Sequence, residues 1–309
     1  MPRWPVVRVG GDGKRQFYTE DEMKYTNTLN LPSTLVDAII NDPYSRGSAD
    51  ISVTQLIQPP KIRVLSSRHR DEMTEDVADR VWALVGNSTH EVLERAAHKD
   101  AIQEERLSIT VGDWKISGQV DMYEDGIITD WKITSCWAIL NGVKPEWVNQ
   151  LNCYAEMWRQ MGFSVKEVQI IAILRDWSKF GGQRSQNYPS KQVVKLPIPL
   201  WGHIETMNYL RDRVRVHQIA ECLTDDEIPC CKPEERWSKA DAWAVVKGNN
   251  KRATRVFNSL KEAEALKADL ESKSKEKYRI DFREGSDVRC LHYCACSEFC
   301  NHFKSIVPF

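Results

Sequence analysis

The sequence has no long apolar run, no excess of one charge and no low-complexity segment. Its 309 residues carry 43 Lys and Arg against 44 Asp and Glu, a formal net charge of −1. The first absence excludes a transmembrane helix, which needs about 20 consecutive apolar residues. The balanced charge excludes overall electrostatic attraction to nucleic acid, so such binding has to come from local basic patches or bound metal ions. The length of 309 residues is enough for one elaborated domain or two small ones, and a hydrophobic content of 41% supports a core.

The start of the chain, Met1-Pro2-Arg3-Trp4, also lacks the apolar segment of a secretory signal. We therefore expect a protein of a bacterial or phage-infected host cytoplasm, where cysteines stay reduced. The nine cysteines are an odd number, and we expect metal binding rather than disulfides where they cluster. Cys136 and Cys153 lie apart from the others and are expected to pack in the core. Residues 1–50 are expected to form an N-terminal extension.

Hydrophobic spacing predicts a run of alternating helices and strands after this extension. An apolar stripe favours a helix over residues 77–96, and three short strands follow between residues 107 and 133. Pro145 suits the first turn of a second helix. The nearly continuous apolar run 168–174 indicates a buried parallel strand. The stripe of the first helix consists of Val77, Val81, Leu84, Val85, Val92, Leu93 and Ala96. This order of elements is typical of an α/β protein.

Two aspartates flank the turn Glu124-Asp125-Gly126 between the second and third strands. Asp121 ends Gly118-Gln119-Val120-Asp121, and Asp130 begins Asp130-Trp131-Lys132. We expect the two carboxylates to converge and to bind Mg²⁺ or Mn²⁺, which prefer oxygen ligands. The Lys132 side chain points to the same face of its strand as Asp130, where it can orient an attacking water or neutralise charge on a phosphate. The alternative is a polar hairpin with surface charges, because the D-x-K triplet is common by chance.

The flanking helices add further polar positions. His90 closes a G-x-x-x-H pattern in the first helix, although a lone histidine is more often a surface or core residue. Gln150 and Tyr154 share one face of the second helix. Tyr154 lies on the apolar stripe, whereas a glutamine beside such a stripe needs hydrogen-bond partners. Glu104 and Glu105, just before the first core strand, are a further source of a carboxylate.

The patterns G-x-x-x-H, G-x-x-D, D-x-K and Q-x-x-x-Y, in this order, resemble the PD-(D/E)XK nuclease superfamily. They look most like its RecB-like branch, which includes the CRISPR-adaptation iron–sulphur nucleases and phage-type exonucleases, over roughly residues 50–175. The resemblance implies an αβββαβ restriction-endonuclease-like core, with a central mixed sheet flanked by helices, over residues 51–225 and a helical N-terminal region. It makes Lys132 the catalytic lysine, while Gln150 and Tyr154 would brace the catalytic site or contact the DNA strand. The implied cation ligands are His90, Asp121, Asp130 and the backbone carbonyl of Trp131.

The implied activity is hydrolysis of DNA phosphodiester bonds by a metal-activated water. The resemblance favours a phage-type exonuclease of DNA replication or recombination. Its partners would be DNA, a recombination or single-strand-binding protein, and further copies of the chain. Two alternatives stay open: a structure-specific endonuclease, and a catalytically silent DNA-binding or scaffold protein of the same fold.

Four cysteines lie within eleven residues near the end of the chain: Cys290, Cys294, Cys296 and Cys300. So dense a set in a reducing compartment predicts a metal site. Iron–sulphur members of the resembled branch place one cysteine ahead of the nuclease core, and this chain has none there. The expected fourth ligand is therefore Cys231. A [4Fe–4S] cluster, or alternatively Zn²⁺, is expected on Cys231, Cys290, Cys294 and Cys300, with Cys230 and Cys296 as alternates.

Residues 226–309 are thus expected to form a C-terminal metal-binding region. Within it, residues 238–284 predict an inserted ββαβ module with a turn at Gly248-Asn249-Asn250. Basic side chains near this turn suit phosphate contacts, with a solvated hairpin face as the alternative. A second basic stretch follows the strand at 168–174 and contains an aromatic suited to stacking on unpaired bases. The candidate DNA contacts are Lys251, Arg252, Arg175, Trp177 and Lys179.

Overall fold

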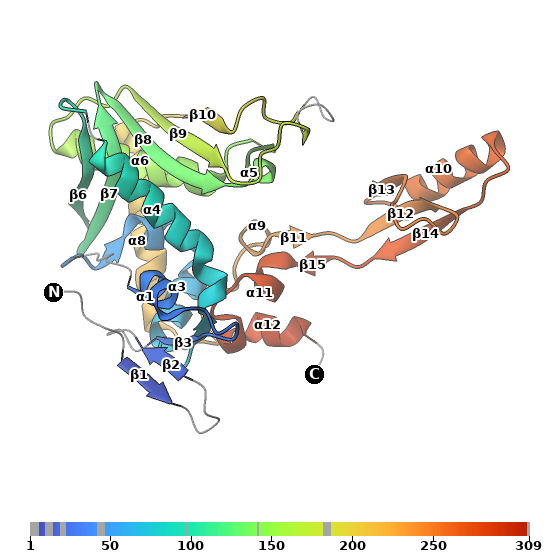
Figure 1. The fold of residues 1–309 in the computed structure, drawn as a ribbon, viewed down its shortest axis with the longest axis horizontal. Helices are drawn as coiled ribbons and strands as arrows, with labels where there is room; N and C mark the ends of the chain where they lie inside the picture. Colours follow the sequence, from blue (N-terminus) through green and yellow to red (C-terminus); the bar gives the residue numbers. More distant parts are fainter. Residues whose placement is uncertain are drawn as a thin grey trace. The chain divides into compact units, whose positions relative to one another are not determined.

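The structure is a computed structural model that describes residues 6–9, 15–18, 23–41, 47–96, 98–140, 142–181 and 187–307 (Figure 1). It divides into two compact units, Met1–Thr224 and Asp225–Phe309. The division falls one residue from the boundary expected from the sequence. None of the helices in the described ranges is long and apolar enough to cross a membrane.

A mixed sheet forms the centre of the first unit (Figure 1). The strand order is β10-β9-β8-β7-β4, and β6 pairs with the other edge of β7. β8 and β9 are parallel, as are β4 and β7, and the remaining pairs are antiparallel. The strands are β4 (Ile51–Ser52), β6 (Ile102–Val111), β7 (Trp114–Glu124), β8 (Ile127–Thr134), β9 (Glu167–Leu174) and β10 (Val193–Ile198). The expectation of a central mixed sheet flanked by helices is confirmed.

Both predicted turns of the meander are present. Gly112 adopts a left-handed φ of 60° between β6 and β7. Asp125 (φ 50°) and Gly126 (φ 87°) are both left-handed between β7 and β8, as a two-residue hairpin turn of type I′ requires. The predicted buried parallel strand is β9, which alternates between buried and half-buried side chains. The tight second turn fixes which residues of β7 and β8 face each other.

Helix α6 (Pro145–Gln160) packs along the sheet, in contact with β6 to β10. Pro145 occupies its first turn as expected, because a missing N–H costs nothing there. Its apolar stripe is buried, and Trp158 stacks on Tyr123 of β7 at 4.3 Å between ring centroids. Cys136 and Cys153 are both buried in the core, as expected. The other helices of this part of the unit are α5 (Cys136–Leu140) and α8 (His203–Cys222).

The first predicted helix is a 3₁₀ turn, Val77–Arg80, followed by α4 (Val81–Arg95). Its predicted apolar stripe is wrong in part, because Val85 and Val92 are 37% and 54% exposed. Only the beginning of α4 packs on a core, which it forms with α1 (Ser33–Ile40). The middle of the helix borders the cavity described below with Asn87, His90, Glu91 and Glu94. Val85 and Val92 do not line this cavity, because they lie about half a turn away on the helix.

The prediction of a helical N-terminal region is also wrong in part. Three strands lie there, β1 (Val6–Val9), β2 (Arg15–Tyr18) and β3 (Lys24–Thr26), and they form a sheet with β5 (Thr74–Asp76). Strands this short carry too few alternating residues to be distinguished from loops by pattern. The parallel pairing of β3 with β5 joins the extension to the rest of the unit. The helices beside it are α1, α2 (Val53–Leu56) and α3 (Pro60–Arg68).

The second unit contains the predicted ββαβ module. β12 (Ala242–Lys247) lies between β13 (Arg255–Phe257) and β14 (Tyr278–Arg283), and α10 (Leu260–Lys273) packs on all three. β11 (Ser238–Lys239) pairs with β15 (Ser286–Asp287) and links the module to the cysteine-rich tail. The remaining elements are α9 (Pro233–Arg236), α11 (Val288–His292), the 3₁₀ turn Ser297–Phe299 and α12 (Asn301–Ile306).

Candidate metal centre

One cavity of about 630 Å³ in the first unit is lined by residues of all four sequence patterns. They come from four different elements: α4, β7, β8 and α6. The predicted residues on its wall are His90, Asp121, Asp130, Lys132, Gln150 and Tyr154. The structure therefore brings together side chains that the sequence spreads over 65 positions, from 90 to 154.

Asp121 and Asp130 meet because of how β7 and β8 pair. The two strands pair at only three positions next to their turn, and Met122↔Thr129 is the last of these. Asp121 and Asp130 are the next residues of the two strands, on the side away from the turn. Trp131 N donates to Asp121 Oδ2 at 2.6 Å. Further along the same edge, β7 pairs with β4 instead. The aspartates therefore stand where β8 separates from β7.

The glycine of the G-x-x-D pattern has a packing reason. A Cβ atom at Gly118 would lie 2.7 Å from Cε1 of Tyr154 and 2.9 Å from Sδ of Met157. Real Cβ atoms do not approach other atoms so closely, so only glycine lets α6 lie this near β7. Gly118 thereby keeps Tyr154 at the cavity wall.

Lys132 and Asp130 form an ion pair of 2.6 Å between Nζ and Oδ2. The Asp130 side chain is 3% exposed, and its Oδ2 lacks a well-directed hydrogen bond among the residues that the structure describes. Burial lowers the pKa of Lys132, but the charges of Asp130 and Asp121 outweigh it and raise that pKa above its usual range. Lys132 is therefore a fixed positive charge in the cavity rather than a general base.

His90 faces two carboxylates. Its Nδ1 lies 3.5 Å from Asp121 Oδ1 and 3.5 Å from Glu104 Oε1. Burial, followed by the charge of Asp130, raises the pKa of Asp121 to about 7. A hydrogen bond to Glu104 raises the pKa of His90 in spite of burial. Carboxylates this close together need a proton or a cation between them, and one imidazole with carboxylate oxygens suits Mn²⁺ or Mg²⁺.

Gln150 and Tyr154 form a pair on the α6 wall. Gln150 Nε2 donates to Tyr154 Oη at 2.9 Å, and both residues are less than 9% exposed. The expected need of Gln150 for a partner is thus met inside the helix. The two polar ends still line the cavity, where they are available to a ligand.

Glu104, which the sequence offered only as a further source of a carboxylate, is also on the cavity wall. It lies inside β6 and lines the cavity, rather than preceding the first strand. A sequence signal was present: the turn at Gly112 pairs Val111 with Trp114, and counting back along this register places Glu104 opposite Asp121. The adjacent Glu105 is exposed.

The candidate DNA contacts differ in environment. The Arg175 guanidinium lies 4.2 Å above the exposed ring of Trp82. Trp177 packs against the central core and donates from Nε1 to Pro189 O at 2.8 Å, so its ring and its N–H group both have partners within the protein. Lys179 is exposed, as are Lys251 and Arg252 in the second unit.

Within the second unit, the expected cysteine ligands shift one another's pKa values. Burial and the neighbouring Cys294 and Cys300 are among the causes that raise the pKa of Cys231 to about 12 and that of Cys290 to about 11. A hydrogen bond from Cys296, with Sγ atoms 3.6 Å apart, lowers the pKa of Cys294 to about 6. Yet no three of their Sγ atoms lie within 4.8 Å of one another in the described part of the chain.

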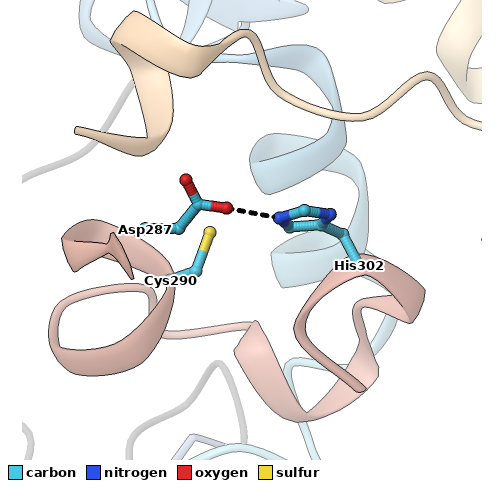
Figure 2. A group of neighbouring side chains, drawn as sticks. All are labelled: Asp287, Cys290 and His302. Atoms are coloured by element: carbon cyan, nitrogen blue, oxygen red, sulfur yellow. Dashed lines mark hydrogen bonds and ion pairs between the residues drawn. The ribbon is translucent and has the colours of Figure 1, made fainter. Parts of the chain in front are cut away.

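A different group of ligand-type side chains in this unit consists of Asp287, Cys290 and His302 (Figure 2). Asp287 Oδ2 lies 2.6 Å from His302 Nε2, and Cys290 points toward the same carboxylate (Figure 2). Arg236 Nη1 lies 3.0 Å from the same oxygen, and Ser238 donates to Asp287 Oδ1. The arginine already supplies the positive charge that a metal ion would bring. This group therefore ties β15 to α12 and is not assigned a cation.

No family model matches the chain, and neither does any curated protein. Among solved structures, a crystal structure of SSO0001 is similar, with 17% identity and a TM-score of 0.39. The match covers 56% of this chain and 79% of the other. What the structure itself defines is a mixed α/β protein with a central sheet and an acidic cavity.

Proposed function

We propose that the protein is a metal-dependent DNA nuclease of the PD-(D/E)XK type. The observation that carries the proposal is the convergence of the His90, Asp121, Asp130–Lys132 and Gln150–Tyr154 patterns in one cavity. A surface hairpin would expose these charges, whereas Asp130 is 2% and Asp121 9% exposed. Burying two carboxylates costs free energy that a bound cation offsets.

The residues divide the chemistry among them. His90, Asp121, Asp130 and the Trp131 carbonyl would hold a divalent cation, which when bound activates water and stabilises charge on the phosphate. Lys132 keeps its positive charge and has N–H groups to donate to an attacking water or a phosphate oxygen. Gln150 and Tyr154 present an amide and a hydroxyl from α6, where they would orient the bound strand.

The test is cleavage of end-labelled and circular DNA, single- and double-stranded, with Mn²⁺ or Mg²⁺. Wild type should cut, whereas Asp130→Ala and Lys132→Ala should lose at least about 100-fold in rate. Asp100→Ala and Lys99→Ala, at exposed positions after α4, are the matched controls and should cut normally. Products from linear but not circular DNA identify the exonuclease of the sequence prediction. An inert wild type on every DNA form refutes the proposal and favours the silent scaffold.

For the second unit we propose a [4Fe–4S] cluster on Cys231, Cys290, Cys294 and Cys300. A single tetrahedral zinc ion with Zn–S bonds of about 2.3 Å holds its thiolates about 3.8 Å apart. A four-iron cluster is larger and holds its thiolates further apart. The raised pKa values of Cys231 and Cys290 mean that their thiolates need a compensating positive charge.

Iron, sulphide and zinc analysis of anaerobically purified protein tests this assignment. We expect brown protein with iron and sulphide, and loss of both in Cys231→Ser. Cys222→Ser, an exposed cysteine at the end of α8, is the control and should keep them. Colourless protein with stoichiometric zinc would show that the cluster assignment is wrong.

A further inference from the structure

Three carboxylates lie in a row across β6, β7 and β8. The pairs Gln103↔Met122 and Glu105↔Val120 place Glu104 opposite Asp121. Asp130 is the next residue after the pair Met122↔Thr129, so it faces Asp121 from the other edge. Like charges directly opposite each other on neighbouring strands are destabilising. A row of three therefore needs a positive charge close to its middle.

Lys132 does not supply this charge for the Glu104 end of the row. Its Nζ lies 2.6 Å from Asp130, on β8. The group that faces Glu104 and Asp121 is His90, at 3.5 Å from an oxygen of each. Imidazole, unlike lysine, is also a metal ligand, and these three side chains offer donor atoms that all lie within 4.8 Å of one another.

Hydrogen bonds leave one oxygen of each carboxylate turned toward His90. Gln119 Nε2 donates to Glu104 Oε2 at 2.8 Å, which leaves Oε1 beside the imidazole. Arg106 in turn donates to the Gln119 side-chain oxygen, which fixes the direction of the amide. Asp121 is arranged in the same way, because Trp131 N occupies Oδ2 and Oδ1 faces His90. Such outer hydrogen bonds are typical of carboxylates that hold a metal ion.

We propose that Glu104 is a ligand of the divalent cation together with His90 and Asp121, and that Gln119 is its positioning residue. The inference rests on the proposed function only in that this cation is the one used for cleavage. Neighbouring donors around an octahedral cation at about 2.1 Å are about 3 Å apart, so spacings of 3.5 Å close with small side-chain movements. The nearby buried Asp130 also lines the cavity, with Oδ2 2.6 Å from Lys132 Nζ.

The competing explanation is that Glu104 serves only as a hydrogen-bond partner of His90. The two explanations differ in what Glu104→Gln changes. Loss of a partner of His90 also weakens cation binding, but only through the imidazole, so Glu104→Gln would have no further effect on Mn²⁺ affinity in a His90→Ala background. A ligand affects cation affinity directly, because an amide nitrogen or a neutral carbonyl replaces a charged oxygen.

The experiment is calorimetric titration of full-length protein with Mn²⁺ alone. Glu104→Gln should bind Mn²⁺ at least about 10-fold more weakly than wild type, and Gln119→Ala should bind several-fold more weakly with Glu104 still in place. The matched control is Glu105→Gln, next to Glu104 but exposed, which should bind as wild type does. Equal affinity of Glu104→Gln and wild type, no Mn²⁺ binding by wild type, or equal affinity of His90→Ala with and without Glu104→Gln overturns the inference. Should Glu104→Gln fail to fold, unchanged affinity in Gln119→Ala overturns it.

Cleavage assays on the same preparations separate this inference from the proposed function. If Asp130→Ala abolishes cleavage while Glu104→Gln binds Mn²⁺ normally, the nuclease proposal is supported and the assignment of Glu104 as a ligand is refuted. If Glu104→Gln no longer binds Mn²⁺ but wild type cuts no DNA, the assignment of Glu104 as a ligand is supported and the nuclease proposal is refuted.

Discussion

Replacing Asp121 with asparagine should stabilise the metal-free protein, although the change removes a proposed cation ligand. Burial and Asp130 raise the pKa of Asp121 from 3.8 to about 7. Between these values the folded protein binds one more proton than the unfolded chain, so the free energy of unfolding falls as pH rises from about 4 to about 7. Asparagine is nearly isosteric, keeps an oxygen for the Trp131 N–H and carries no charge to bury.

The size of the effect follows from the shift. A difference of about three pKa units, at about 1.4 kcal/mol each, corresponds to up to about 4 kcal/mol in favour of Asp121→Asn above pH 7. The charge of His90 lowers the pKa of Asp121, and this effect is already contained in the figure. Below pH 4 the two proteins should be nearly equal in stability.

Urea unfolding of the full chain, followed by tryptophan fluorescence in chelator at pH 4 to 8, measures this difference. Asp113→Asn, at the exposed turn after Gly112, is the control and should show no such pH dependence. Excess Mn²⁺ at about 100 times its dissociation constant should add about 2.7 kcal/mol to wild type and nothing to Asp121→Asn. The reasoning is refuted if the difference between Asp121→Asn and wild type does not grow with pH, or if the variant is the less stable protein at pH 8.

Other substitutions separate chemistry from packing. Lys132→Met should lower the cleavage rate at saturating metal by about 100-fold or more. Its Mn²⁺ affinity, measured by calorimetry, should stay at or above that of wild type, because a positive charge near the cation is removed. Weakened Mn²⁺ binding would contradict the role assigned to Lys132. Gly118→Ala should lower stability by about 1–3 kcal/mol in urea unfolding, since its Cβ would overlap Tyr154. Gly86→Ala, in a helix with open space around it, should instead stabilise by up to about 1 kcal/mol, and equal effects of both changes would refute the packing argument.

The central part of the fold could be predicted because its signals are local. The turn at Asp125-Gly126 and the alternation of β6 to β8 define a meander from adjacent residues. Pro145 and the apolar spacing after it define α6 in the same way. The convergence of Asp121 and Asp130 then follows from the turn alone, without knowledge of the rest of the sheet.

What could not be predicted depends on contacts between distant segments. Val85 and Val92 have the spacing of a buried stripe, yet neither belongs to a core cluster of the described residues, and no sequence pattern shows whether a distant segment will pack on a helix face. The pairing of β3 with β5 joins residues 50 positions apart. Glu104 was within reach of prediction, because its position opposite Asp121 needs only the register set at the turn of Gly112.

The paired strands β6, β7 and β8 also bear on the order in which the chain folds. Glu104, Asp121, Asp130 and Lys132 all lie within 29 consecutive residues joined by two tight turns. Closing such short loops costs little conformational entropy and takes microseconds, whereas the pairing of β4 with β7 closes a loop of about 65 residues. We therefore expect the acidic row to assemble early, before its helices cover it. Repulsion among the carboxylates of this row should then slow formation of the sheet, and a divalent cation present during refolding should speed formation of the sheet.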